Sequence, residues 1–129
     1  MKILLKIFII YLLFAPSSSL ANEKKQSLQK IYTLLQEKKF AEGIKNLKIL
    51  SNKNDINAQL LYSKILFSGD LIPQDFENSY FWGLSALLGG LKKSYKILEK
   101  LGEYLTEEQI REITTRLRDF LEKRAFVKD

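Results

Sequence analysis

The chain has 129 residues, of which 46% are hydrophobic and 28% charged, and this composition is typical of one globular domain rather than of a disordered chain. It contains no cysteine and no histidine, which excludes disulfide bonds, thiolate and imidazole metal sites, and catalysis by a Cys-His pair or a Ser-His-Asp triad. Only carboxylates, lysines and tyrosines remain as acid-base groups, so we predict a protein that is not an enzyme and binds no metal or cofactor.

The N-terminal segment, residues 1–21, has the pattern of a signal peptide. Lys2 and Lys6 precede an unbroken apolar run over residues 7–15, and small residues stand before the expected cleavage between Ala21 and Asn22. The run is too short to cross a bilayer, which takes about 20 apolar residues. We therefore expect a periplasmic or secreted protein with no membrane association after cleavage. The alternative is a membrane-tethered structural protein that keeps residues 1–21.

The net charge of the mature chain is modest. The full chain has 21 basic and 15 acidic residues, a net charge of +6, and loss of Lys2 and Lys6 leaves 19 minus 15, or +4. The remaining lysines alternate with glutamates, as in residues 23–25 and 37–39, which is typical of solvated helix faces. No basic stripe with interleaved aromatic residues is present, so we expect no nucleic-acid partner.

Hydrophobic residues recur at helical spacing along the mature chain, and no segment alternates convincingly with the period of a strand. A first helix is expected over residues 23–38. A second begins at Phe40 and ends at the polar residues 52–54. Asp55 is expected to cap a third helix, and Gly69 to end it in a left-handed conformation.

The second half of the chain carries further start and stop signals. Asp75 is expected to cap a fourth helix, which ends at two glycines, residues 89–90. A fifth helix is expected over residues 91–101. Thr106 and Gln109 form a capping box that opens a sixth helix, and the tail from residue 125 onward is expected to fray. The sequence thus predicts an all-α fold.

The second and fourth helices are related by a spacing of 36 residues (76 minus 40). The matched pairs are Phe40 and Phe76, Gly43 and Ser79, Ile44 and Tyr80, and Leu50 and Ala86. This register favours an α-α superhelix, a short solenoid of about three helical hairpins in which each hairpin covers its neighbours. We expect residues 22–54 to form a degenerate first hairpin, residues 55–90 the best repeat, and residues 91–129 a set of capping helices.

Small residues, an aspartate and a tryptophan stand at set positions in residues 58–90. They are Ala58, Gly69, Asp75, Trp82, Ala86 and Gly90, with Ile72 in the turn between the two helices. This segment resembles the Sel-one-like repeat, a family of helical hairpins related to the tetratricopeptide repeat. The departures from the family pattern are apolar or small exchanges, at Tyr62, Ser63, Leu66, Leu71, Ser79 and Leu87. The resemblance implies that the motif residues pack the hairpin and that none of them is catalytic.

The resemblance also implies a function, because such proteins serve as interaction adaptors and exported bacterial members commonly act in envelope, signalling or host-contact assemblies. We expect a non-catalytic scaffold that binds an unknown protein or peptide on the concave side of the solenoid, which the first helix of each hairpin lines. The candidate contact residues are Gln29, Thr33, Gln59, Ser63 and Lys64. A small exported hydrolase that uses carboxylates is an alternative, although the acidic residues are dispersed over helix surfaces.

Two neighbouring aromatic residues of the fourth helix allow two interpretations. Trp82 is the only tryptophan of the chain, and it either packs between hairpins or contacts a partner. Its place in the repeat favours packing. Phe81 is expected to be partly exposed, which makes it the more interesting of the two for binding.

Overall fold

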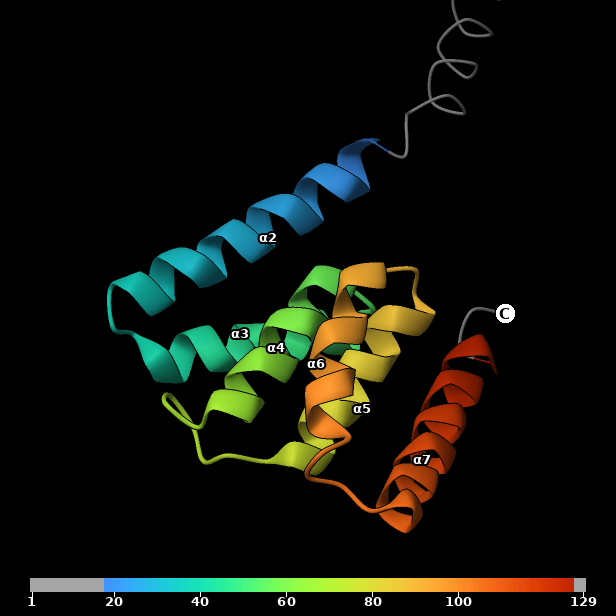
Figure 1. Cartoon of the computed structure of the whole chain (residues 1–129). Helices are drawn as coiled ribbons and strands as arrows, with labels where there is room; N and C mark the ends of the chain where they lie inside the picture. The colour runs from blue at the N-terminus through green and yellow to red at the C-terminus, as the bar shows by residue number, and fades with distance from the viewer. Residues whose placement is uncertain (1–17, 127–129) are drawn as a thin grey trace, which may run out of the picture.

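The computed structural model describes residues 18–126, which form six α helices, one short 3-10 helix and no strand. The elements are α2 (Ser18–Gln36), α3 (Phe40–Asn52), α4 (Ile56–Ser68), α5 (Phe76–Leu88), η1 (Lys92–Ser94), α6 (Tyr95–Leu101) and α7 (Glu107–Phe126). The molecule extends from α2 at one side to α7 at the other (Figure 1). The all-α prediction is confirmed for this part of the chain. None of the helices within residues 18–126 is long and apolar enough to span a membrane.

Most of the expected signal peptide, residues 1–17, lies outside the described residues. The expected cleavage site is described, and both Ala21 and Asn22 belong to α2. This helix begins at Ser18, before the expected start at residue 23, and ends at Gln36, before the expected end at residue 38. Cleavage after Ala21 leaves the buried side chains of α2, Ile31 and Leu34, in the mature chain.

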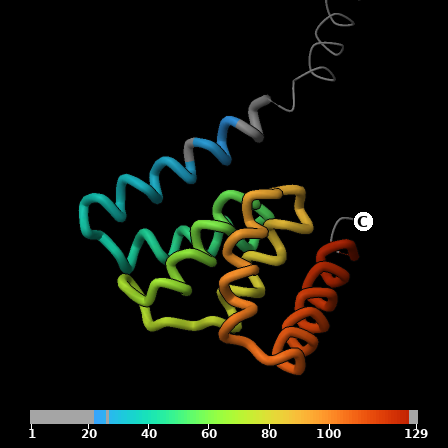
Figure 2. Tube along the Cα trace, viewed as in Figure 1, coloured from blue at the N-terminus to red at the C-terminus, as the bar shows by residue number. Residues whose placement is uncertain are grey.

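Each helix packs mainly on its neighbours in sequence. Helix α2 contacts α3, α3 contacts α4, and α4 contacts α5 along most of its length. Helix α5 then contacts η1, α6 and α7, so the last two helices lie against α5 rather than closing a tight hairpin with each other (Figure 2). Helices α6 and α7 therefore do not form a third regular hairpin. The connection between them places α7 on a different face of α5 from α6.

The expected helix starts are confirmed in their hydrogen bonds. The Asp55 side chain accepts a bond of 2.9 Å from the Ala58 amide at the start of α4, and Asp75 accepts one of 3.0 Å from the Asn78 amide at the start of α5. In the capping box, the Thr106 amide donates to the Gln109 side chain at 2.9 Å, and the Gln109 amide donates to the Thr106 hydroxyl at 3.1 Å. These side chains satisfy amides that have no partner within the helix.

Three helices end in the same way, at a residue with positive φ. Lys38 has φ 61°, Asn54 φ 68° and Gly90 φ 104°. In each case the next amide donates to the carbonyl five residues back, as from Lys39 to Leu34 at 2.9 Å, which is a Schellman motif. The end of α2 at Gln36 was not predicted, because Lys38 stands at the left-handed position where glycine or asparagine is the usual signal. The left-handed end of α4 at Gly69, φ 71°, is confirmed.

The fifth and sixth helices differ in detail from the expectation. The segment expected as one helix over residues 91–101 is divided into η1 and α6. The tight turn of η1 buries Ser94, whose hydroxyl donates to the Gly83 carbonyl of α5 at 2.6 Å. Helix α7 continues through Phe126, so Ala125 is helical although the tail was expected to fray from there. Residues 127–129 lie outside the described residues.

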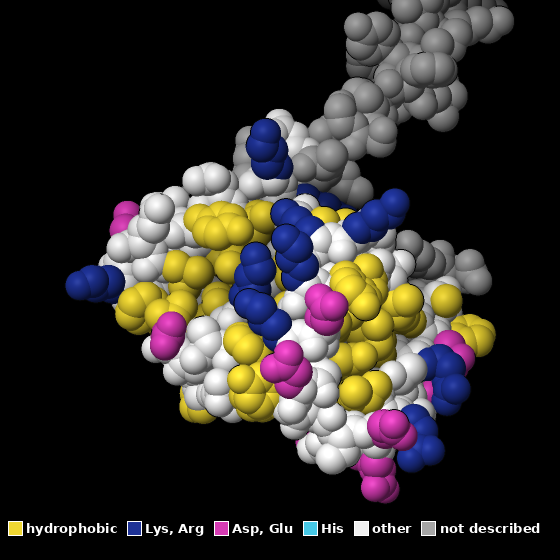
Figure 3. Space-filling view, in the orientation of Figure 1, with side chains coloured by type: hydrophobic (Ala, Val, Ile, Leu, Met, Phe, Trp, Pro, Cys, Tyr) yellow, Lys and Arg dark blue, Asp and Glu magenta, His cyan; other side chains and the backbone are white. Residues whose placement is uncertain are grey.

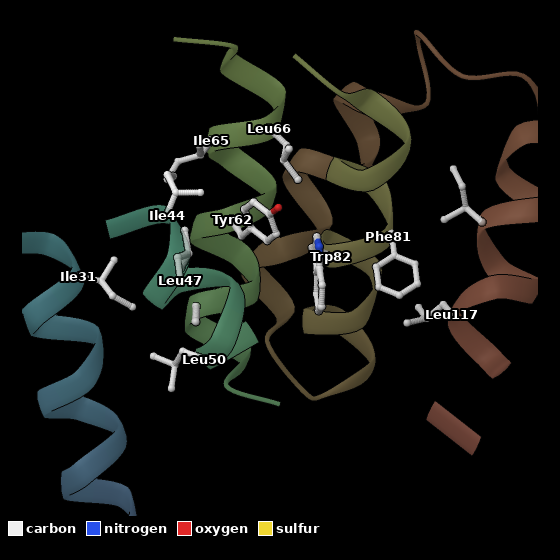
Figure 4. Close-up of a cluster of buried hydrophobic side chains, with 12 residues drawn as sticks. Ile31, Ile44, Leu47, Leu50, Tyr62, Ile65, Leu66, Phe81, Trp82 and Leu117 are labelled. Atoms are coloured by element: carbon white, nitrogen blue, oxygen red, sulfur yellow. The ribbon is translucent and has the colours of Figure 1, made fainter. Parts of the chain in front are cut away.

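The hydrophobic core runs through the stack between successive helices. Its central members come from α2, α3, α4, α5 and α7 (Figure 4). Trp82 lies near the middle, with ring centroids 5.8 Å from Tyr62 and 5.7 Å from Phe120. A second cluster joins Leu60 and Ala86 to Ile97 and Leu101 of α6. Full burial of one such aliphatic side chain contributes about 1.5–3 kcal/mol to stability. The side chains that are buried between neighbouring helices therefore hold those helices together.

Candidate functional site

A groove lies between α4 and α6, and four of its lining residues are lysines. It has a volume of about 400 Å³. The lining residues are Leu60, Lys64 and Phe67 from α4, Lys93 from η1, and Lys96, Ile97 and Lys100 from α6. We call this hollow the lysine groove. Its charged residues are all basic, and its uncharged residues are all apolar.

Helix periodicity explains why these residues share one groove. Leu60, Lys64 and Phe67 are spaced i, i+4 and i+7 on α4, which puts them on one face. Lys93, Lys96 and Lys100 are spaced i, i+3 and i+7 along η1 and α6, and the same rule places them together. The two faces meet because Leu60 and Ile97 pack in the same buried cluster. The lysines lie on either side of an apolar floor, formed by Leu60 and Ile97, which are part of the hydrophobic core.

The four lysine ammonium groups form no ion pair with an acidic side chain of residues 18–126. The ion pairs within residues 18–126 are Lys39 with Glu37 and Arg118 with Asp119, and neither lies in the groove. No carboxylate lines the groove. Figure 3 shows basic side chains in a row between apolar areas on this face of the molecule, with acidic side chains only beside the row. The groove therefore combines four lysines that form no ion pair within residues 18–126 with an apolar floor.

A second, smaller hollow continues the lysine groove toward α2. It has a volume of about 120 Å³ and shares Leu60, Lys64 and Lys93 with the lysine groove. Its other lining residues are Leu28 and Tyr32 of α2 and Asn57 and Leu61 of α4. Together the two hollows form one surface that reaches from α2 across α4 to α6.

Of the five expected contact residues, Lys64 lines this surface and the others do not. Gln29 and Thr33 are exposed on α2, but the α2 residues that face the surface are Leu28 and Tyr32. The Thr33 hydroxyl donates to the Gln29 carbonyl at 3.1 Å, a bond within the helix. The two residues therefore lie beside the surface without forming it.

The expectation that Gln59 and Ser63 contact a partner is corrected, because both are 0% exposed. The Gln59 amide nitrogen donates to the Ser51 carbonyl of α3 at 3.0 Å. The Ser63 hydroxyl donates to the Ser79 carbonyl of α5 at 2.6 Å. Both side chains therefore connect α4 to a neighbouring helix, and neither reaches the surface.

The repeat-motif residues lie inside the hairpin or at its ends. Ala58, Trp82 and Ala86 are buried, while Gly69 and Gly90 have positive φ. Phe81 is only 6% exposed, so the expectation of partial exposure is wrong. Helix α7 covers its ring, with the Phe120 centroid at 5.4 Å and the Arg116 guanidinium carbon at 5.0 Å.

The groove residues that sequence reasoning missed include Phe67 of α4 and the three lysines of η1 and α6. A signal for them was present, because Lys93, Lys96 and Lys100 recur at helical spacing. That signal places three charges on one helix face but does not show which helix they approach. Tyr32 of α2, which was not among the expected contact residues, is 42% exposed and lines the continuation of the groove.

The remaining surfaces offer less distinct chemistry. An apolar hollow between α5 and α7 is lined by Leu84, Leu88 and Leu121 among others. Another, between α3 and the connection from α4 to α5, is lined by Ile44, Ile49 and Ile72 among others. Within residues 18–126 no three His, Cys, Asp or Glu side chains gather where they could hold a metal ion.

No protein-family model matches the chain, and comparison with curated proteins and with solved structures finds no match.

Proposed function

We propose that the chain is an exported, non-catalytic repeat scaffold that binds a protein or peptide segment along the surface from α2 across α4 to α6. The observation that carries the proposal is this continuous surface, which α2, α4 and α6 with the adjoining η1 line. A repeat scaffold presents such a surface because equivalent helices recur side by side.

The relation between α3 and α5 supports a repeat architecture. Gly43 and Ser79, at equivalent positions 36 residues apart (79 minus 43), are both buried. A Cβ atom at Gly43 would lie 2.9 Å from Leu35 of α2, and the Ser79 hydroxyl donates to the Ser63 carbonyl of α4 at 2.7 Å. Each small residue thus faces the first helix of its own pair at close range. The resemblance of residues 58–90 to the Sel-one-like repeat supports the same architecture, a short superhelix that α6 and α7 cap.

Export rests on the signal-peptide pattern of residues 1–21, and location in the periplasm or outside the cell is part of the proposal. A membrane-tethered chain is the alternative. The intact mass of the protein from its native host decides between them. The mass of a chain that begins at Asn22 supports export with cleavage, whereas the mass of a chain that begins at Met1 contradicts it.

The proposal that the chain is a scaffold is tested by affinity capture from the native envelope fraction. Lys64→Trp fills the centre of the surface with a bulky side chain whatever the chemistry of the partner, and we expect it to abolish capture. Lys123→Trp, at an exposed position of α7 outside this surface, is the matched control and should leave capture intact. Loss of capture with Lys123→Trp but not with Lys64→Trp would place binding at the cap and contradict the proposal.

The alternative of a small hydrolase that uses carboxylates predicts a different result. Its activity would depend on one or two acidic residues rather than on the lysine groove. A screen of the purified chain in which turnover disappears with a single Asp or Glu substitution would replace the scaffold proposal. The dispersed acidic side chains and the absence of a carboxylate in the groove favour the scaffold.

A further inference from the structure

We propose that the segment held in the lysine groove is acidic, namely an extended peptide in which carboxylates flank an apolar side chain. This inference rests on the proposed scaffold function and names the chemistry of the partner. Two independent features of the groove carry it, the four unpaired lysines and the apolar floor between them.

The four lysines form no ion pair within the described residues. On α6, side chains at i+3 and i+4 spacing stand about 5–6 Å apart at their Cβ atoms, and like charges at such range repel. Lys64 adds a further positive charge from the opposite wall of the groove. An occupant with several carboxylates relieves this repulsion and forms ion pairs with the lysines. Charge complementarity of this kind favours specific partners and fast association.

The floor of the groove selects an apolar side chain. Leu60 and Ile97 are buried in the core and fix the base of the groove. Phe67 is held by aromatic contacts, with ring centroids 5.6 Å from Phe76 and 6.1 Å from Tyr104. Tyr104 in turn stacks on Phe76 at 4.6 Å. A floor held in this way is preformed, so an apolar side chain can bind it without a large ordering cost.

The shape of the site favours a peptide over a membrane or a nucleic acid. The lysines border a hollow of about 400 Å³ that narrows toward α2, whereas a bilayer surface meets protruding side chains on a flat or convex face. Single-stranded nucleic acid stacks its successive bases on several exposed aromatic faces. Of the two aromatic residues that line this surface, Tyr32 is exposed, but the ring of Phe67 packs against Phe76 and Tyr104. An extended segment that crosses from α2 to α6 fits both hollows.

The experiment measures the binding of a fluorescein-labelled peptide of alternating glutamate and leucine. The protein is the full chain in the form that is purified from the cells that produce it. The groove variant replaces four lysines by glutamine, at Lys64, Lys93, Lys96 and Lys100. The control variant removes the same charge elsewhere, at Lys25, Lys30, Lys53 and Lys123. We expect the Kd to rise at least about tenfold in the groove variant, since it loses up to four ion pairs, and to change less than about twofold in the control variant. Circular dichroism checks that both variants are folded.

Further probes separate the proposal from its competitors. A peptide with serine in place of leucine should bind more weakly, because it does not use the apolar floor, and a peptide with lysine in place of glutamate should not bind. Equal loss in the groove and control variants, or equal binding of the serine peptide, overturns the proposal. So does groove-dependent binding of anionic phospholipid vesicles or of an oligonucleotide in place of the peptide. If no acidic peptide binds but Lys64→Trp still abolishes capture, the acidic chemistry is wrong and the scaffold function remains.

Discussion

Ser63 on α4 and Ser79 on α5 exchange hydrogen bonds, because each hydroxyl donates to the backbone carbonyl of the other residue, at 2.6 Å and 2.7 Å. The two hydroxyl oxygens are 3.2 Å apart. Both serines were identified from the sequence as departures from the Sel-one-like repeat pattern that we propose for residues 58–90. The two departures therefore face each other, and the polar group that each one adds is satisfied by the other helix.

This exchange predicts the stability of serine variants. Ser63→Ala should lower the free energy of unfolding by about 1 kcal/mol, the usual contribution of a buried hydrogen bond. Ser85→Ala is the matched control on α5, because the Ser85 hydroxyl is also buried but has no hydrogen-bond partner within the described residues. We expect it to leave stability unchanged or to raise it. Urea unfolding of both variants measures the difference, and equal effects would contradict the role given to the exchange.

A bulkier substitution at the same place tests how closely the helices approach. A Cβ atom added at Gly83 would lie 3.0 Å from the Ser63 hydroxyl oxygen and 3.1 Å from a Leu98 methyl group. Gly83→Val should therefore destabilise the fold by about 1–3 kcal/mol through overpacking. Thermal unfolding measures this, and an unchanged melting temperature would mean that α5 does not lie so close to α4 and α6.

The N-cap of α5 provides a third prediction. Asp75→Ala removes the acceptor of the Asn78 amide and should cost about 1 kcal/mol of unfolding free energy. Asp70→Ala is the control, because Asp70 is exposed in the preceding turn and its side chain caps no helix. Chemical denaturation of the two variants should separate them, and a loss of equal size in both would point to net charge instead of capping.

Close packing at Ala86 provides a fourth prediction. Ala86 is 0% exposed and shares a buried cluster with Leu60 and Ile97. Ala86→Trp should cost about 3 kcal/mol or more, because the larger side chain has no space between α4, α5 and α6. Leu88→Trp, at a position 63% exposed on the same helix, should change the melting temperature little. If the two variants melt alike, the helices are not tightly packed at Ala86.

The pKa of Tyr62 makes stability depend on pH at the alkaline end. Burial raises the pKa of its phenol, and the charge of Asp75 raises it further. An unfolded chain, whose tyrosines titrate at about pH 10, therefore loses this proton first as the pH rises. The stabilising contribution is fully present below about pH 10 and is lost as the pH rises through the raised pKa.

Tyr62→Phe should accordingly reduce the loss of stability above about pH 10 while changing stability little at neutral pH. Tyr32→Phe is the control, because that ring is 42% exposed. Urea unfolding at neutral and alkaline pH measures both variants. If the free energy of unfolding falls equally steeply with pH in Tyr62→Phe and in Tyr32→Phe, the role given to Tyr62 is wrong.

Local signals explain which parts of the fold could be predicted from the sequence. The caps at Asp55, Asp75 and Thr106 and the stop at Gly69 depend on residues within one turn, and these were predicted correctly. The end of α2 was misplaced because Lys38 adopts the positive φ that glycine usually signals. Local sequence is informative where the hydrogen bond that decides the structure is itself local.

The candidate site depended on packing over longer distances and was therefore largely missed. Gln59 is polar and was assigned to the surface, but α3 covers it and its side chain bonds to Ser51. Phe81 was expected at the surface, but α7 returns to α5 and covers it. Lys64 was identified, whereas the lysines of η1 and α6 join it only because Ile97 packs beside Leu60. Which helix faces which neighbour cannot be inferred from periodicity alone.

Site-specific photo-cross-linking in the native host tests the central claim most directly, since it maps where a partner touches the chain. A photoreactive phenylalanine at Tyr32 or at Lys93 lies on the surface from α2 across α4 to α6. The control position, Arg111, is exposed on α7 away from that surface. We predict a protein adduct of the same mass from Tyr32 and Lys93 and none from Arg111. An adduct from Arg111 alone would contradict the claim that this surface binds the partner.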